Sequence, residues 1–181
     1  ALGSKLFHYE KGFAKILYKN FVDIPHNDGT PTVIKTENIL IAPGSHPRYL
    51  PNISIDEKII VTSDGVKNIM DFPKSLVILG AGVIGCEFAT IFSNFGKTKV
   101  YIIDKANRIL PFEDEDISKT VTENLERNGV VVHHNSQLER MEIKNGKVEY
   151  ELLYKDGKRE IITVDKCLVA VGREPNIKDI G

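Results

Sequence analysis

The spacing of apolar residues predicts alternating strands and helices in the middle of the chain. Residues 76–79 form a short, wholly apolar run, typical of a strand buried on both faces of a parallel sheet. Gly96 stands where a helix would end, and the apolar residues before it recur at helical spacing: Ile84, Phe88, Ile91, Phe92 and Phe95. Residues 100–103 form a second apolar strand. Strand, glycine turn, helix and strand in this order predict a βαβ unit.

A second helix is predicted over residues 116–128. Ile117, Val121 and Leu125 recur at i, i+4 and i+8, acidic residues occupy the first turn, and Gly129 follows as a stop signal. Residues 130–132 are the next apolar strand, so the unit continues as βαβαβ.

From Leu138 onward the apolar period falls to two, the period of strands. Asn145-Gly146 and Asp156-Gly157 stand between the alternating runs, where such dipeptides form hairpin turns. A three-stranded antiparallel β-meander is therefore expected, followed by an apolar strand over residues 166–171. The predicted fold class is α/β, with a parallel sheet, helices on one face of it, and the meander.

The first third of the chain repeats the last part at a fixed offset of 128 residues. A match without gaps across about twenty residues favours duplication over chance. Because the second copy has a βαβαβ half before its meander and the first has none, we expect the chain to begin inside a domain whose front half is missing. The matched positions are Asp28-Gly29 with Asp156-Gly157, Val33-Ile34 with Ile161-Ile162, 39–42 with 167–170, Gly44 with Gly172 and Pro47 with Pro175.

Charge and hydropathy exclude some classes of function. The chain has 181 residues, with 24 Lys+Arg against 25 Asp+Glu and a formal net charge of -1. Without a basic stripe, neither a nucleic acid nor an anionic membrane is an expected partner. The longest apolar stretch, residues 76–86, is well short of the ~18 to 20 residues of a membrane-spanning helix.

The cysteines and histidines give no sign of a disulfide, a metal site or a catalytic group. Cys86 and Cys167 lie far apart and belong to no CxxC or Cys/His spacing, so both are expected to pack in the core of a protein from a reducing compartment. His133 and His134 are adjacent, and a strand would point them to opposite faces. The N-terminus lacks the pattern of a secretory signal, so we expect a cytoplasmic or mitochondrial-matrix protein that is not secreted.

The strongest chemical signal is Gly80-Ala81-Gly82-Val83-Ile84-Gly85, placed between a strand and a helix. In that context the first glycine allows a tight turn, the second lets a pyrophosphate approach the backbone, and the third lets helix and strand pack closely. The phosphates would meet the free N–H groups at the start of the helix. The alternative is a glycine-rich turn needed only for packing.

Two acidic residues near the glycines have two interpretations each. Asp104 follows the second strand, 19 residues after Gly85, where a carboxylate would bind the adenosine ribose hydroxyls and repel a 2′-phosphate. It is otherwise a solvated strand-end acid, with Lys105 and Arg108 available to bind a 2′-phosphate instead. Glu87 is expected in the first turn of the helix, either favoured there by the helix dipole or near a nicotinamide ring.

Nearly the whole chain resembles the pyridine nucleotide-disulfide oxidoreductase family. The family is built from duplicated FAD- and NAD-binding domains, which agrees with the internal repeat. The resemblance rests on Lys11-Gly12-Phe13-Ala14, Thr36 to Ser45, Phe72-Pro73-Lys74-Ser75, Gly80 to Glu87, Arg108-Ile109-Leu110-Pro111 followed by Asp114-Glu115-Asp116, and Ala170-Val171-Gly172-Arg173-Glu174-Pro175-Asn176.

Carried over by position, the resemblance implies two cofactor sites in a Rossmann-like FAD/NAD(P)-binding fold. The NAD site would be lined by Gly80, Ala81, Gly82, Val83, Ile84, Gly85, Glu87, Asp104, Leu138 and Gly172, with Glu87 beside the nicotinamide. Ala14, Pro43, Gly44 and Ser45 would belong to the FAD site. The family usually has Thr where this chain has Pro43, and proline has no N–H to donate.

The resemblance also implies an organisation and an activity. Residues 1–50 would be a remnant of an FAD-binding domain, its β-meander and its last strand at 39–42, with 51–72 a linker and 73–181 an NAD-binding domain. The family's FAD-binding GxGxxG, redox-active CxxxxC and C-terminal His-Glu pair have no counterpart in the sequence. We therefore expect the NAD-binding segment of a larger flavoenzyme, inactive by itself.

In that parent enzyme, the implied reaction is dihydrolipoamide oxidation with NAD. The partners would be NAD(H), the remaining FAD and dimerisation domains, and a lipoyl domain of a 2-oxo acid dehydrogenase complex. Soluble transhydrogenase, mercuric reductase and NADH oxidase activities remain open alternatives, as does a stand-alone dinucleotide-binding module without catalysis.

Overall fold

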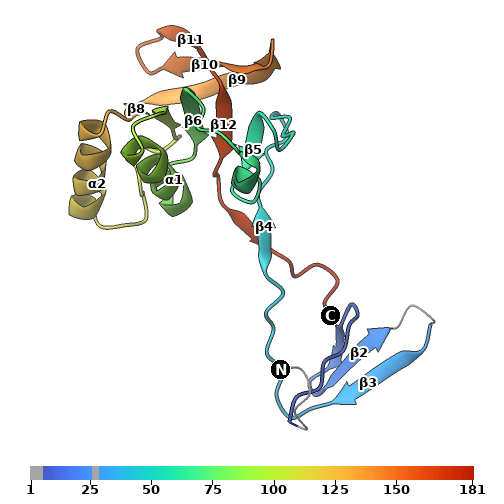
Figure 1. Cartoon of the computed structure of the whole chain (residues 1–181). Coiled ribbons are helices and arrows are strands. Elements are labelled where there is room, and N and C mark those ends of the chain that lie inside the picture. Colours follow the sequence, from blue (N-terminus) through green and yellow to red (C-terminus); the bar gives the residue numbers. More distant parts are fainter. Residues whose placement is uncertain (1–5, 26–28) are drawn as a thin grey trace. The chain divides into compact units, whose positions relative to one another are not determined.

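The computed structural model describes residues 6–25 and 29–181. They divide into two compact units, one within Ala1–Ser45 and Pro175–Gly181, the other His46–Glu174 (Figure 1). Each unit is described by itself below. Among the described residues, no helix is both long and apolar enough to cross a membrane.

The larger unit is built on a five-stranded parallel sheet. The strand after the meander inserts beside the strand that precedes the glycine-rich turn, so the spatial order differs from the order in the sequence. In spatial order the strands are β5 (Ile60–Thr62), β12 (Lys166–Val169), β6 (Ser75–Leu79), β7 (Lys99–Ile103) and β8 (Val131–His133).

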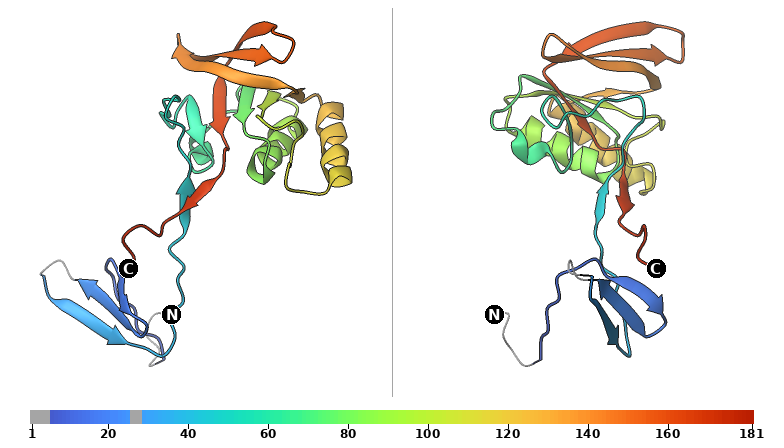
Figure 2. Two further views of the ribbon diagram at one scale, coloured as in Figure 1. Left: turned by 180° about the vertical axis from the view of Figure 1, so that it is seen from behind. Right: turned by 90° about the vertical axis from the view of Figure 1, so that its right-hand side faces the viewer.

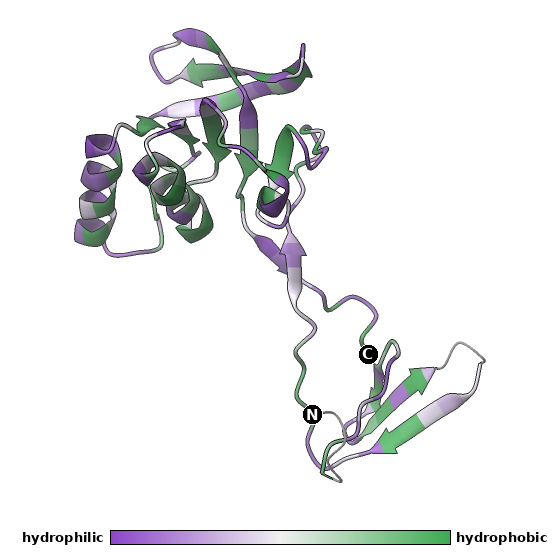
Figure 3. Ribbon diagram, in the orientation of Figure 1, coloured by the Kyte–Doolittle hydropathy of each residue, from purple (hydrophilic) through white to green (hydrophobic). Residues whose placement is uncertain are grey.

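Two α-helices connect the strands of this sheet, as the periodicity predicted. Helix α1 is Val83–Asn94 and helix α2 is Glu115–Arg127, each within about a residue of its expected bounds. The side chain of Asp114 accepts a hydrogen bond from the N–H of Asp116 and caps α2. The short 3-10 helix η1, Val66–Asn68, lies after β5. In Figure 3, β5 and β6 are green while α2 carries purple along much of its length.

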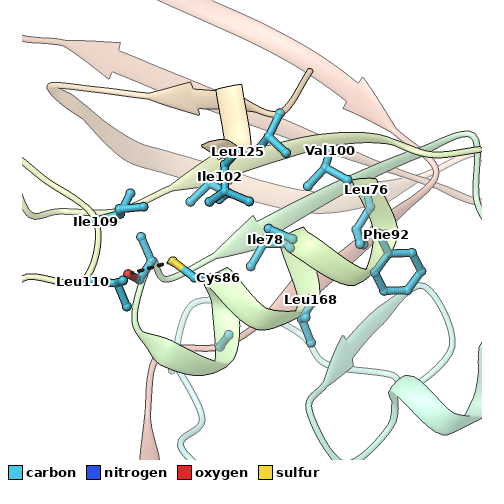
Figure 4. Close-up of a cluster of buried hydrophobic side chains, with 14 of the residues drawn as sticks. Leu76, Ile78, Cys86, Phe92, Val100, Ile102, Ile109, Leu110, Leu125 and Leu168 are labelled. Carbon is cyan, nitrogen blue, oxygen red and sulfur yellow. Dashed lines mark hydrogen bonds between the residues drawn. The ribbon is translucent and has the colours of Figure 1, made fainter. Parts of the chain in front are cut away.

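The parallel sheet is buried on both faces because alternate residues of its strands point to opposite sides. One face packs against α1 and α2 in a cluster that includes Leu76, Ile78 and Ile102, drawn in Figure 4. The other face carries Val77 and Cys167 and packs against the meander. Figure 2 shows the helices on one side of the sheet and the meander on the other. The predicted fold class is confirmed.

The meander consists of β9 (Ser136–Lys144), β10 (Lys147–Tyr154) and β11 (Arg159–Val164), with β10 in the centre. Asn145 and Gly146 both have positive φ, 51° and 75°, which is the backbone of the tight hairpin turn expected there. The inward residues of β10 meet the parallel sheet, so the unit has three layers.

The smaller unit contains the first copy of the meander: β1 (Lys15–Tyr18), β2 (Phe21–Pro25) and β3 (Pro31–Lys35). The β2–β3 ladder runs from the Phe21–Lys35 pair to the Pro25–Pro31 pair. The β10–β11 ladder contains the matching pairs from Glu149–Thr163 to Leu153–Arg159 and one more pair, Val148–Val164. These registers coincide at the offset of 128. Asp28, matched with Asp156, lies outside the described residues.

The strand expected at residues 39–42 is not formed. Leu40 is 93% exposed and Ile41 54% exposed, in an extended segment outside the ladders. The matched strand β12 is held between β5 and β6, and among the described residues of the smaller unit no strand pairs with 39–42. An apolar run becomes a strand only where other strands satisfy its N–H and C=O groups.

Residues 51–72, expected to be a linker, contain β5 and η1. β5 is an edge strand of the parallel sheet, paired with β12 from Ile60 opposite Cys167 to Thr62 opposite Val169. The compact units divide after residues 45 and 174, whereas the expected domain boundaries fall at 50 and 72. Those boundaries stay a prediction.

The segments that follow each copy are also related by the repeat. Strands β4 (Ser45–Pro47) and β13 (Arg173–Pro175) form a two-stranded sheet. The N–H of Arg48 donates to Gly172 O at 3.0 Å, and the N–H of Asn176 donates to Gly44 O at 3.0 Å. Adding 128 to 44 and 48 gives 172 and 176, so each bond is the repeat image of the other.

Candidate functional site

Three segments meet where neighbouring parallel strands end. Gly80 directly follows β6, Asp104 directly follows β7, and Gly172 lies just beyond β12. These strands are adjacent in the sheet, in the order β12-β6-β7. The crevice at the carboxyl ends of parallel strands is where α/β folds bind nucleotides.

The structure requires glycine at two of the three motif positions and leaves space for a side chain at the third. A Cβ at Gly80, where φ is 105°, would collide with the backbone of Ala170, and a Cβ at Gly85 would collide with the carbonyl of Gly80. Both positions therefore need glycine for the fold. A Cβ at Gly82 would meet nothing within 4 Å, and its φ of -77° suits any residue. Packing among the described residues therefore does not require glycine at position 82.

The helix that follows is suited to an anion. Gly82 is the N-cap of α1 and provides no side-chain cap, and Val83 at the first helical position is 55% exposed. The N–H of Cys86 is the one that closes on Gly82 O. The amides of residues 83–85 precede it and have no acceptor within the helix. They and the helix dipole favour a phosphate.

Asp104 is half-buried and its carboxylate faces back toward the glycine turn. Oδ2 accepts a hydrogen bond from the N–H of Ala81 at 2.6 Å, and Oδ1 accepts one from the N–H of Ala106 at 2.8 Å. Each oxygen keeps a further acceptor position. The carboxylate is therefore fixed beside the site, where a ribose hydroxyl could donate to it.

The two cations considered as partners of a 2′-phosphate differ in placement. Arg108 Nη2 donates to the carbonyls of Pro111 and Glu113 at 3.1 and 3.0 Å, whereas Nη1 is buried and has no hydrogen-bond partner among the described residues. Its guanidinium is thus directed into the loop after β7. Lys105 is exposed and lies at a cavity beside that loop.

Glu87 is the fifth residue of α1, so it lies in the second turn, and the first turn contains no acidic residue. The sequence-based placement in the first turn was wrong: the helix begins at Val83 as expected, and a turn holds only 3.6 residues. The side chain of Glu87 is exposed. Leu138, on β9 opposite Leu152, is half-buried and packs against the cluster beneath the meander.

The residues expected to contact FAD belong to the smaller unit. Ala14 is exposed in the loop before β1, Pro43 and Gly44 are exposed between β3 and β4, and Ser45 begins β4. Gly44 has a φ of 76°, and Asn176 Nδ2 donates to the carbonyl of Pro43 at 3.1 Å. Their assignment to an FAD site stays a prediction.

Sequence reasoning missed a buried aromatic network around His133. The ring is 8% exposed and stacks on Tyr101 at 5.8 Å between centroids. Nδ1 lies 3.0 Å from the hydroxyl of Tyr154, which donates to Glu160 at 3.0 Å, and Nε2 lies 3.4 Å from the hydroxyl of Tyr150. Burial lowers the pKa of His133. The adjacent histidines gave no signal of this, because the partners come from three other strands.

A cavity of about 550 Å³ opens next to this network. Tyr154 forms one wall, and the residues after Asp104 and before Leu138 form others. Asp104 and Leu138 themselves were predicted to line the dinucleotide site. The lining residues are Lys105, Ala106, Asn107, Asn135, Ser136, Gln137, Leu153, Tyr154, Lys155 and Gly157.

Both cysteines are free and buried in the larger unit. Cys86 Sγ lies 3.5 Å from the carbonyl of Ala81, and burial, followed by the charge of Asp104, raises its pKa to about 11 (Figure 4). Burial alone raises the pKa of Cys167, which is 0% exposed on β12. Neither thiol is a nucleophile at neutral pH. Among the described residues, no group of three His, Cys, Asp or Glu side chains is arranged to hold a metal ion.

Fold and site together define a Rossmann-like dinucleotide-binding protein. The sequence profile of the pyridine nucleotide-disulphide oxidoreductases matches residues 2–180, and the chain belongs to that family. It is 39% identical over 168 residues to dihydrolipoyl dehydrogenase of Bacillus subtilis and 35% identical over 176 residues to the mitochondrial dihydrolipoyl dehydrogenase of Dictyostelium discoideum. It is also 34% identical over 174 residues to a soluble pyridine nucleotide transhydrogenase of Yersinia pestis.

These matches cover most of this chain and about a third of each relative. They span 92 to 96% of the chain and 35 to 36% of the relatives named above. Among solved structures, the flavoprotein disulfide reductase RclA from Escherichia coli is similar with a TM-score of 0.74 at 29% identity, over 93% of this chain and 37% of that one. LpdA from Mycobacterium tuberculosis, with a TM-score of 0.78 at 23% identity over 94% and 37%, shows the same fold.

Proposed function

We propose that this chain is the NAD-binding segment of a flavin-dependent disulfide oxidoreductase, and specifically of a dihydrolipoyl dehydrogenase. In the whole enzyme the reaction is the oxidation of dihydrolipoamide to lipoamide with reduction of NAD to NADH. The support for this activity is the name of the two relatives that are 39% and 35% identical. The part of the reaction that falls to this chain is to bind and orient the nicotinamide cofactor, which supplies the hydride acceptor when bound.

The observation that carries the proposal is the contrast between Gly82 and its neighbours. Packing within the chain accounts for Gly80 and Gly85 but leaves space at Gly82. That space lies at the N-cap of α1, where no side chain caps the helix and the first N–H groups have no acceptor within it. A pyrophosphate fits both features, because it needs close backbone approach and hydrogen-bond donors at once.

The choice of NAD over NADP rests on Asp104. Its carboxylate is fixed at the end of β7 by the N–H groups of Ala81 and Ala106. A 2′-phosphate ~4 Å from a carboxylate meets a repulsion of about 1 to 4 kcal/mol per unit charge at effective dielectrics of 80 to 20. Arg108, which could offset that repulsion, directs its guanidinium to carbonyls of its own loop.

The finer parts of the proposal concern the whole enzyme. Ala14, Pro43, Gly44 and Ser45 would lie at the FAD site, and the remaining FAD and dimerisation domains would be supplied by the rest of the parent. A lipoyl domain would deliver the dithiol. The two buried free thiols suit a reducing compartment, either the bacterial cytoplasm or the mitochondrial matrix.

The test is a fluorescence titration of the chain with NADH and with NADPH. We expect NADH to bind at least about fivefold more tightly, which is the fold-change that 1 kcal/mol gives. In Asp104→Ala the ratio of the two affinities should fall toward one, whatever happens to the absolute affinities. Glu123→Ala, an exposed acid on α2, is the control and should leave the ratio unchanged. Equal affinities in the wild-type chain would overturn the assignment to NAD.

A second variant tests the glycine turn itself. Gly82→Val should abolish binding of both nucleotides at an unchanged melting temperature, because its side chain enters space that the chain leaves open. Gly85→Val is the matched control and should lower the melting temperature, because a Cβ there meets the backbone of Gly80. If Gly82→Val still bound NADH normally, the turn would serve packing alone.

The same titration addresses the transhydrogenase alternative, which the 34% identical relative from Yersinia pestis favours. An enzyme that transfers hydride between the two pyridine nucleotides must accept both. Comparable affinity for NADH and NADPH would therefore favour that function over dihydrolipoyl dehydrogenase.

A further inference from the structure

The loop between β7 and α2, residues 104–113, binds both backbone polar groups of Ala81, its N–H and its C=O. Asp104 Oδ2 accepts the N–H of Ala81 at 2.6 Å, and the N–H of Leu110 donates to the carbonyl of Ala81 at 2.7 Å. Ala81 lies between the first two glycines of the motif and is itself 0% exposed. The residue between the two glycines is thus held by the loop, which we call the brace.

Leu110 adopts an unusual backbone conformation to make this contact. Its φ is 46°, in the left-handed region that bulky side chains avoid, and the following Pro111 further restricts it. Such strain persists only where surrounding contacts enforce it, and it gathers at functional positions. Here the side chain is 8% exposed within the apolar cluster, and Glu113 N–H donates to Leu110 O at 3.0 Å, closing a turn.

Two residues that face away from the glycines keep this turn in place. Arg108 Nη2 donates to the carbonyls of Pro111 and Glu113. Ser118, 2% exposed on α2, donates from Oγ to the carbonyl of Ile109 at 2.6 Å. Arg108 thus holds the residues that follow Leu110, and Ser118 links the residue before Leu110 to α2.

We propose that Arg108, Leu110 and Ser118 are positioning residues that pre-organise the glycine turn for a dinucleotide. They act through the peptide of Ala81 and need not touch the ligand. A turn already held in its bound geometry loses less conformational entropy on binding, which raises affinity. The inference rests on the proposed function, since it assigns a purpose to that same site. It also gives the motif Arg108-Ile109-Leu110-Pro111 a physical reason.

Ser118→Ala is the most direct test because it removes one buried hydroxyl, changes no charge and lies on α2. We expect the affinities for NADH and NADPH to fall by the same factor, roughly three- to tenfold, as for loss of one hydrogen bond. The Ala81 amide of the ligand-free chain should exchange its hydrogen faster by a similar factor. Thr120→Ala is the matched control, since its hydroxyl donates to Asp116 O on the exposed side of the same helix.

Arg108→Met gives an independent variant with its own control. Loss of the guanidinium should weaken NADH and NADPH equally, whereas Lys119→Met, which removes an exposed charge on α2, should leave NADH binding unchanged. If Arg108→Met weakened NADPH alone, Arg108 would be a ligand of the 2′-phosphate, and its proposed positioning role would be wrong. Affinities are measured well below the melting temperature of each variant, so that global destabilisation does not contribute.

Hydrogen exchange keeps the two proposals separable. If the wild-type chain bound neither nucleotide, the proposed function would fail. Exchange at Ala81 in Ser118→Ala and Arg108→Met would still decide whether the brace holds Ala81 in place. Val148→Ala, which opens space in the other cluster, should lower the melting temperature without affecting Ala81 or the affinities. Unchanged exchange at Ala81 in both brace variants would overturn the inference.

Discussion

The two meanders have the same ladder register but different surroundings. β3 and β11 alternate between exposed and half-buried residues in the same order at the offset of 128. On the central strand, Tyr150 and Leu152 are 0% exposed, whereas the matched Val22 is half-buried and Ile24 is 8% exposed. Val148 in the core of the second copy corresponds to Asn20, which donates from its side chain to Thr36 O.

The difference shows which properties a repeated sequence specifies by itself. Register follows from alternation and turn residues, which are local, so both copies share it. Burial follows from a second layer, and only the copy in the larger unit packs on a parallel sheet. The two duplicated meanders therefore keep the same strand register although their side chains are buried to different extents.

The largest effect that tests this comparison is expected for Leu152→Ala. The side chain is fully buried between the meander and the parallel sheet, so its loss should cost about 2 to 5 kcal/mol of unfolding free energy. Ile161→Ala, on the outward face of β11 and 59% exposed, is the control and should cost under about 0.5 kcal/mol. Urea denaturation measures both. Equal costs would mean that the layer beneath β10 contributes little.

Amide exchange compares the copies without any substitution. Amides in the β10 ladder should exchange at least about tenfold more slowly than the matched amides of β2, because opening β10 also exposes the core beneath it. The pair to compare is Tyr150 and Val22. Equal protection of the matched amides would show that hydrogen bonding within the ladder, and not the second layer, determines local stability.

Acid should affect the second copy through His133. Its pKa is lowered by burial, so between that value and about 6.5 the unfolded chain binds more protons than the folded one. Stability should therefore fall as pH decreases from 7 to 5, by at most about 1.4 kcal/mol per pH unit. His133→Gln should flatten this dependence in thermal melts, and the exposed His134→Gln should not. A dependence that persists in His133→Gln would assign it to another group.

The smallest effect is expected when an ion pair is transplanted from one copy to the other. Arg159 donates to Glu151 at 2.8 Å across β10 and β11, and the matched residues of the first copy are Pro31 and Asp23. Pro31→Arg should place a guanidinium beside Asp23 and add about 0.2 to 1 kcal/mol, an increment that salt removes. Pro31→Gln is the control for loss of proline. No difference between them would show that the strand surroundings differ more than the register suggests.

The sequence was sufficient to predict elements that carry their own signals. The glycine turn, both helices and the second meander follow from local periodicity and turn residues, and the structure has them. The positions of Gly80, Gly82 and Asp104 at adjacent strand ends follow from the βαβ pattern alone. These features depend on neighbours within a few residues in the chain.

What the sequence did not predict depends on partners far along the chain. The run 39–42 looked like a strand and forms none, whereas no periodicity indicated β5, which forms because β12 pairs with it. The contacts of Asp104 and Leu110 with Ala81 join residues 23 to 29 positions apart, and no periodicity indicates them. The same holds for the ring of partners around His133.

The two buried thiols of the larger unit can report how often its core opens. Cys86 and Cys167 lie in the core, one on each face of the parallel sheet, with raised pKa values. An alkylating reagent can reach each thiol only while the layer over that face of the sheet is open. The labelling rate of Cys86 therefore reports opening of the helical layer, and that of Cys167 opening of the meander layer. For the same reason, a cysteine introduced on the surface would be labelled alone, with no need to remove the native pair.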